Sequence, residues 1–318
     1  MKICQLLILI VLLLSCEKNK INTDLNTIMV TNTTKNYNYE PIYRLKITSS
    51  LSYNIKINGV TTATKNQNAG DTRWFLINNC IPASGEQNIE ITLLPRMSNN
   101  GTEHLETIDE KDEFTLEVEK TSWKDGSLVE PSIVYTFVLN EGAAVNKKVY
   151  LHKGTFKADV PYQLVDWRDG KDLSKIDSLK LKEQLLKSYE KIKSSFENQQ
   201  GQQFVKAVEK GMFNLAQGAY LKTVEFENLK EDKQSFINKQ KRELESFSFN
   251  KLDLSGDGKL VSLRRVDGYN GGEGVLRRKY KKNGQETVHI DDIMFCMPKN
   301  SDSLEVVVYQ NLVKPYYP

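Results

Sequence analysis

The sequence has few of the residues with which enzymes do chemistry. It contains three histidines and four cysteines among 318 residues, with no His-x-x-x-His and no Cys-x-x-Cys spacing, so a zinc site has no support. A phosphate-binding P-loop, a dinucleotide-binding glycine fingerprint and a Gly-x-Ser-x-Gly nucleophile motif are also missing. The sequence therefore predicts a protein that is not an enzyme and that has no metal and no cofactor.

Cysteine is scarce enough to exclude a disulfide framework. After residue 16 the chain has only Cys80 and Cys296, and both lie in apolar, strand-like runs. A free cysteine in such a run behaves as a small buried hydrophobe. We therefore expect two separate buried thiols rather than one bridge.

Long apolar runs are missing beyond the first residues, so no transmembrane helix is expected later in the chain. The apolar run Ile3–Leu14 follows Lys2 and has the length of a signal-peptide core. It ends in Leu-Leu-Ser-Cys at Cys16, which resembles the lipobox of bacterial lipoproteins. The resemblance implies a signal peptide over 1–15, lipid on Cys16 and a membrane-anchored lipoprotein that faces the periplasm or lies on the cell surface. The alternative is an ordinary secretory signal with a chance cysteine.

Residues 16–40 are rich in Asn, Thr and charged residues and contain few apolar ones. Such a segment cannot bury enough surface to offset the entropy of ordering it. We interpret it as a flexible tether between the lipid and the folded body.

Residues 41–162 alternate apolar and polar residues with a period of two, as half-buried strands do. Turn signals such as Asn58-Gly59 and Ser84-Gly85 separate seven or eight such runs. This pattern predicts an antiparallel β-sandwich. Residues 53–95 resemble the β-sandwich modules of secreted bacterial proteins.

Residues 163–172 form a connector in which we expect Trp167 to pack between two domains. From residue 173 to 318 the period first becomes helical, over three segments of which the third runs from Leu229 to Phe247. Four strand patterns follow, over 259–266, 274–280, 288–297 and 303–312. Three helices followed by a four-stranded antiparallel sheet predict an α+β domain, similar to cystatin-like and NTF2-like rolls.

One basic cluster stands out in this second half, where 26 Lys and Arg face 21 Asp and Glu. Its candidate partner-binding residues are Arg264, Arg265, Arg277, Arg278 and Lys279. The cluster places like charges on neighbouring strands, which costs stability, so it indicates an acidic protein partner. We expect the helices to cover one face of the sheet and the cations on the other face to be free. A merely solvated face is the alternative, and an extracytoplasmic chain is not expected to bind nucleic acid.

Two weaker candidates remain. Asp253-Leu-Ser-Gly-Asp-Gly258 has the first oxygen ligands of a calcium-binding EF-hand loop, but Arg264 stands where the bidentate Glu is required, so a polar β-turn is the preferred interpretation. His289 lies close to Asp291 and Asp292 and could form an acid–base pair, although a structural role is favoured.

The order of these features resembles a poorly characterised class of two-domain bacterial lipoproteins, some of which are immunity proteins against secreted toxins. The residues that carry the resemblance are the lipobox at Cys16, Ile57-Asn-Gly59 with Ser84-Gly85, the joint from Pro161 to Trp167 and the closing sheet. The resemblance implies a non-enzymatic protein-binding module. The alternative is a glycan- or cell-wall-binding lipoprotein that presents exposed aromatic residues such as Trp74 and Trp123.

Overall fold

The structure is a computed structural model that describes residues 33–66, 71–99, 103–125, 127–140 and 142–316. The expected signal peptide, Cys16 and most of the expected tether therefore lie outside the described residues. Within them the chain is a β-rich mixed protein with three α-helices and antiparallel sheets, which confirms the sequence prediction at that level. No helix of the described part is both long enough and apolar enough to span a bilayer.

The N-terminal half forms two four-stranded antiparallel sheets. One has the order β4-β1-β6-β9, and the other has the order β10-β5-β2-β3. Their strands are β1 (Ile42–Ser49), β2 (Ser52–Ile57), β3 (Val60–Lys65), β4 (Asp71–Leu76), β5 (Gly85–Leu94), β6 (Phe114–Thr121), β9 (Ser132–Val138) and β10 (Tyr150–Ala158). A short hairpin of β7 (Trp123–Lys124) and β8 (Ser127–Leu128) follows β6.

Alternation explains these strands. Leu45, Ile55 and Leu116 point into one core shared by both sheets and are fully buried, whereas their neighbours along each strand point away from it. A 3₁₀ turn (η1, Asn78–Cys80) closes one end of this core. The side chain of Asn78 accepts from the Tyr43 N–H at 2.8 Å and so ties the turn to β1.

The helices are α2 (Ser178–Glu197), α3 (Gly201–Gly218) and α4 (Thr223–Lys239). The Asp177 side chain caps α2 by accepting from the Lys180 N–H at 2.9 Å. Helix α3 packs very closely on the C-terminal sheet, because a Cβ on Gly211 would lie 2.9 Å from the Tyr309 backbone. The expectation that the third helix continues to Phe247 is wrong. The chain becomes extended at Gln240, and the Glu245 N–H donates to the Arg277 carbonyl at 2.8 Å.

The C-terminal sheet has five strands rather than the four expected. They are β11 (Asn250–Ser255), β12 (Leu260–Arg265), β13 (Leu276–Lys282), β14 (Gln285–Cys296) and β15 (Glu305–Pro315). The long strand β14 pairs with β15 along one edge and with β13 and then β12 along the other. The strand that we missed, β11, is an edge strand that carries Asp253, the first residue of the segment interpreted as a polar turn.

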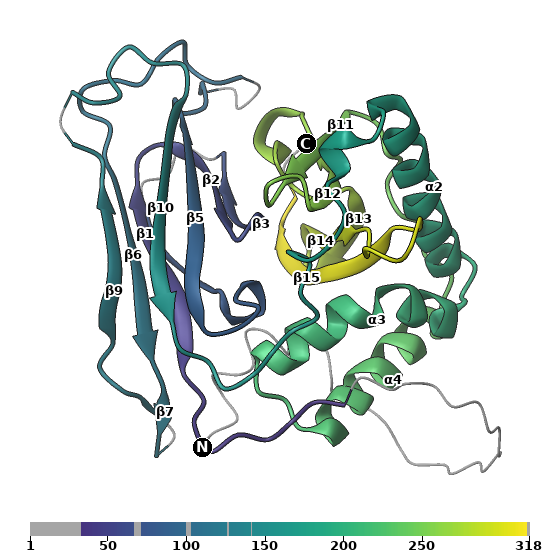
Figure 1. Cartoon of the computed structure of the whole chain (residues 1–318). Coiled ribbons are helices and arrows are strands. Elements are labelled where there is room, and N and C mark those ends of the chain that lie inside the picture. Colours follow the sequence, from purple (N-terminus) through teal and green to yellow (C-terminus); the bar gives the residue numbers. More distant parts are fainter. Residues whose placement is uncertain (1–32, 67–70, 100–102, 126, 141, 317–318) are drawn as a thin grey trace.

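Both faces of this sheet are covered, which corrects the expectation of one free face. Ile293 and Phe295 of β14 point into the core under the helices. Met294 and Cys296 point the other way and belong to the core of the N-terminal sheets. Figure 1 shows the C-terminal sheet between the two N-terminal sheets and the helices. The sheet is therefore the middle layer of the molecule.

Two features join the halves. Trp167 is fully buried, as expected of a residue at the joint, and its Nε1 donates to the Asn58 carbonyl at 3.0 Å. The adjacent turn residue Gly59 has a φ of +81°, and a Cβ there would lie 2.3 Å from the Gly256 backbone. The backbones of two turns from distant parts of the sequence thus lie in direct contact, because both turns have glycine at the point where they meet. Cys80 and Cys296 are both free and buried, as the sequence predicted.

Candidate functional site

Two of the five predicted partner-binding cations are buried and form ion pairs with carboxylates. Arg264 and Arg277 have side chains only 2% and 0% exposed. Arg264 Nη1 lies 2.6 Å and 2.8 Å from the carboxylate oxygens of Asp292, and Arg277 Nη1 lies 2.6 Å from Glu273. The prediction that these residues belong to an exposed binding face is therefore wrong for Arg264 and Arg277.

Two further cations of the cluster face acidic residues as well. Arg265 binds Asp267 through two nitrogens and lies 3.1 Å from a Glu245 oxygen. Lys279 is half-exposed, hydrogen-bonds the Tyr316 hydroxyl and lies 3.8 Å from Glu245. The sequence showed like charges on neighbouring strands, but Glu245 reaches them from the segment after α4, which no strand pattern reveals.

Arg278 differs from the other four. It forms no ion pair with any described residue, and its guanidinium carbon lies 5.0 Å from the ring centres of both Phe236 and Tyr280. Arg242, just beyond α4, lies 4.0 Å from the same Phe236 ring and also lacks an ion pair within the described residues. Arg242 Nη1 donates instead to the carbonyls of Phe236 and Gln240 at 2.6 Å and 2.9 Å. Two unpaired guanidiniums thus share one aromatic ring.

The electrostatic surroundings of these two arginines favour the loss of their charge. Burial lowers the pKa of Arg278, the nearby Asp291 raises it in part, and Arg242 lowers it again as a like charge. Burial alone lowers the pKa of Arg242. Arginine nevertheless stays protonated at physiological pH, so both side chains are cations in surroundings that disfavour charge.

A buried anion network lies under Arg278. Asp291 accepts from Lys233 Nζ at 2.7 Å and from the Tyr309 hydroxyl at 2.6 Å, and His289 Nε2 lies 3.4 Å away. Burial alone would raise the pKa of Asp291, but Lys233 and His289 outweigh it and hold the pKa well below its ordinary value. The network is a fixed anion that ties α4 to the sheet.

The expected acid–base pair is therefore formed only in part. His289 meets Asp291, whereas Asp292 lies on the opposite face of β14 and binds Arg264. Burial and the charge of Asp291 raise the pKa of Tyr309 well above its ordinary value. This arrangement is built to hold charge in place.

The calcium interpretation finds no geometric support. Asp253 pairs with Lys56 of β2 at 2.8 Å, and Asp257 lies in the tight turn between β11 and β12 with a φ of +53°. No group of three or more His, Cys, Asp or Glu in the described part could hold a metal ion. The segment is a β-turn that also links the two halves.

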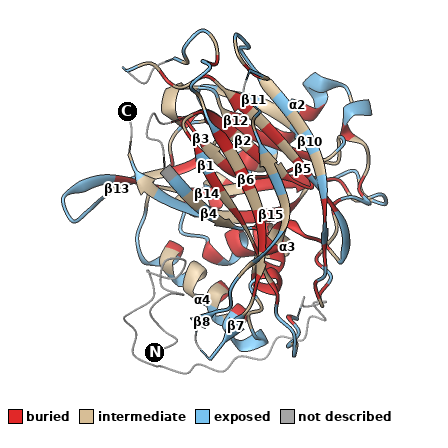
Figure 2. Cartoon of the chain, turned by 90° about the vertical axis from the view of Figure 1, so that its left-hand side faces the viewer, coloured by how far each residue is buried: buried red, intermediate tan, exposed pale blue. Residues whose placement is uncertain are grey.

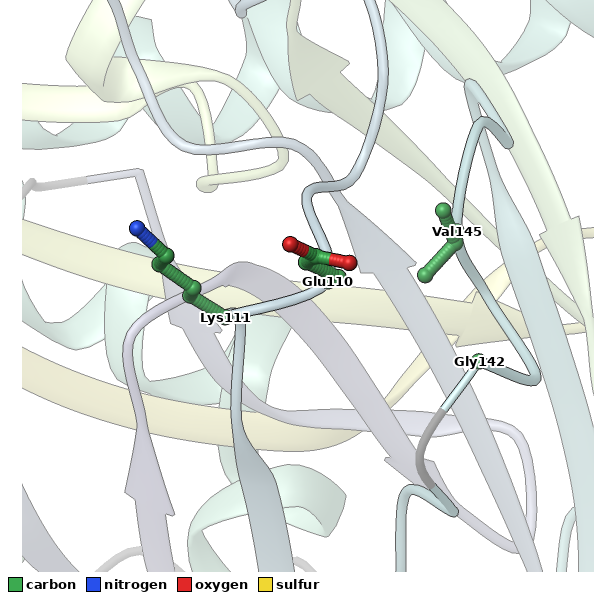
Figure 3. A pocket seen from close by; sticks show the side chains of 4 residues that line it. All are labelled: Glu110, Lys111, Gly142 and Val145. Carbon is green, nitrogen blue, oxygen red and sulfur yellow. The ribbon is translucent and has the colours of Figure 1, made fainter.

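The N-terminal sheets expose aromatic and apolar side chains. Trp74 on β4 is 52% exposed and faces Lys46 across the β1–β4 pairing. Trp123 in the β7–β8 hairpin is 44% exposed. A surface hollow of about 610 Å³ lies elsewhere, between two loops, and Figure 3 shows the four residues that line it. They are Glu110, Lys111, Gly142 and Val145, which offer neither a nucleophile nor a convergent set of polar groups.

Comparisons with known protein families, with curated proteins and with solved structures find no match to this chain. The site must therefore be judged by its own chemistry. Sequence reasoning found Arg278 but missed Arg242 and Phe236, which lie about forty residues earlier. The one available signal was the basic run Lys239-Gln-Lys-Arg242 at the end of a helical pattern.

Proposed function

We propose that this chain is a membrane-anchored extracytoplasmic lipoprotein that acts as a non-enzymatic binding module for an acidic protein partner. The observation that carries the proposal is that Arg278 and Arg242 have no acidic partner within the described residues, while four neighbouring cations do. An acidic surface would supply the missing counter-charge and speed association.

We further propose immunity to a secreted toxin as the biological role. A lipid on Cys16, a cation surface and the missing catalytic motifs suit a protein that blocks another protein at the envelope. In this proposal the N-terminal sheets are the β-sandwich, and the helices with the C-terminal sheet are the α+β roll, of the lipoprotein class that the sequence resembles.

Partner capture tests the binding role. The full chain is used to isolate a partner from cells that carry the neighbouring genes, and association is followed at several salt concentrations. Arg278→Glu should slow association by about tenfold or more and remove much of its salt dependence. Lys157→Glu, an exposed lysine on β10, is the matched control and should change little. Equal rates for both variants would contradict the proposed surface.

Metabolic labelling tests the anchor. Labelled palmitate should enter the wild-type chain but not Cys16→Ala, and the variant should leave the membrane fraction. A mature form that begins before Cys16 and contains no label would show that the chain is not anchored by lipid on Cys16.

Glycan binding is the second candidate, favoured by the exposure of Trp74 and Trp123. Aromatic rings offer apolar surface that can stack on a sugar. Trp74→Ala and Trp123→Ala should then abolish retardation of the chain in gels that contain cell-wall polysaccharide. Retention unchanged in both variants would remove this candidate.

A further inference from the structure

We infer that Arg242 and Arg278 form a carboxylate-binding clamp around Phe236, and that its ligand is an acidic peptide segment. The inference rests on the proposed function and names the group that the partner must present. The clamp joins the end of α4 to β13, two elements that are far apart in the sequence. The clamp shares only Arg278 with the five-residue cluster predicted from the sequence.

The geometry fixes one guanidinium against the ring and a second one beside it. Arg242 is held by the carbonyls of Phe236 and Gln240, at 2.6 Å and 2.9 Å, so its position is set by the end of the helix. Arg278 packs against the Phe236 and Tyr280 rings, both at 5.0 Å. Stacking on aromatic rings leaves the edges of a guanidinium available for hydrogen bonds.

The anion under the clamp, Asp291, raises the pKa of Arg278 but forms its hydrogen bonds with other groups. His289 lies directly across from Arg278 on β14, and its Nε2 lies 3.4 Å from Asp291. Asp291 is already bound by Lys233 and Tyr309 and is fully buried. Arg278 Nε and His289 Nδ1 are buried and have no hydrogen-bond partner among the described residues. The positive charge at this place is therefore incompletely compensated.

Planar guanidiniums match the two oxygens of a carboxylate, which makes a glutamate or aspartate side chain the best ligand. Both arginines are only partly exposed, at the base of a β13–β14 hairpin whose outer end stands clear of the body (Figure 2). A recessed pair of cations suits a side chain that projects from a partner better than a flat membrane surface.

Fluorescence anisotropy with the detergent-solubilised full chain tests the clamp. The probe is labelled hexaglutamate, with hexaglutamine as the uncharged peptide. Arg242→Gln and Arg278→Gln should each weaken hexaglutamate binding by about tenfold, and the Lys variants, which keep the charge but not the planar fork, should weaken it severalfold. Lys281→Gln removes one exposed charge from the same strand and should stay within about twofold. Thermal melts confirm that each variant is folded.

Three results would overturn the clamp: equal weakening by all three Gln variants, full binding by both Lys variants, or binding of inorganic phosphate or phosphatidylglycerol vesicles in preference to hexaglutamate. The proposed function fails separately. Arginine-dependent peptide binding without any captured partner would keep the clamp and reject the role. A captured partner that ignores both arginines would keep the role and reject the clamp.

Discussion

The C-terminal half contains two kinds of arginine, and the difference between them separates stability from binding. Arg264 and Arg277 are fully buried and are matched by carboxylates at hydrogen-bond distance. Arg242 and Arg278 are partly exposed, rest on a phenylalanine ring and have no carboxylate within 4.0 Å among the described residues. From the sequence alone, Arg264 on β12 cannot be told apart in role from Arg277 and Arg278 on β13.

Burial explains why the two kinds differ. A buried charge must be compensated within the fold, because its lost hydration is worth several kcal/mol. A partly exposed arginine keeps some hydration and can remain unpaired at a modest cost. A carboxylate partner within the fold therefore indicates a structural role, and a partly exposed arginine without one among the described residues indicates a place for an external ligand.

The largest effect is expected when a buried pair is broken. Arg264→Gln leaves the Asp292 carboxylate without its cation and should lower the free energy of unfolding by about 3–5 kcal/mol. Chemical denaturation of both chains measures this loss. The double variant Arg264→Met with Asp292→Leu should recover most of this loss. An Arg264→Gln variant as stable as the wild type would contradict the structural role of the buried arginines.

The buried anion network should give stability a marked acid dependence. The pKa of Asp291 lies well below its unfolded value of about 3.9, so its contribution is complete above that pH and is lost as pH falls towards the folded pKa. Asp291→Asn should cost about 3 kcal/mol at neutral pH, since Lys233 loses its counter-charge. The variant should also show a shallower decline in stability below pH 4, measured by denaturant titration at each pH. Parallel pH profiles for the two chains would mean that Asp291 is not held as an anion.

The smallest stability effect is expected at the clamp. Arg278→Gln loses its contacts with the Phe236 and Tyr280 rings, and Arg242→Gln loses a ring contact and two hydrogen bonds to carbonyls. Each also removes a like-charge neighbour, so each should lower the free energy of unfolding by about 1–2 kcal/mol at most. The same denaturation experiment measures it. A loss as large as that of Arg264→Gln would make these arginines structural and remove the basis of the clamp.

The sequence predicted local structure better than it predicted what lies opposite each strand. Period-two alternation located β1 and β6, and helical spacing located α2 and α3, because both patterns are set by one buried face. The edge strand β11 escaped, since its Asp253 was interpreted as the start of a polar turn and instead pairs with Lys56 from the other half. No local pattern encodes such a partner.

The same limit applies to the site. The like charges on β12 and β13 are visible in the sequence, but the acids that neutralise them come from loops and from the neighbouring strand β14. The assumption of one free sheet face failed because the N-terminal sheets cover that face, through contacts such as Gly59 on Gly256. Contacts between distant turns depend on the tertiary arrangement, and the only sign of this one in the sequence is a glycine in each turn.

Helix α4 also separates the clamp from the first described residues of the chain. The first described residues, expected to belong to a free tether, are docked at its start, where the Thr223 hydroxyl donates to the Thr34 carbonyl at 3.0 Å. Phe236 lies thirteen residues further along the helix, a rise of about 20 Å. With the lipid on Cys16 that we propose, the anchoring chain meets the body at one end of α4 and the arginines stand at the other. Helix α4 thus separates the point where the chain enters the described body from the clamp by about 20 Å.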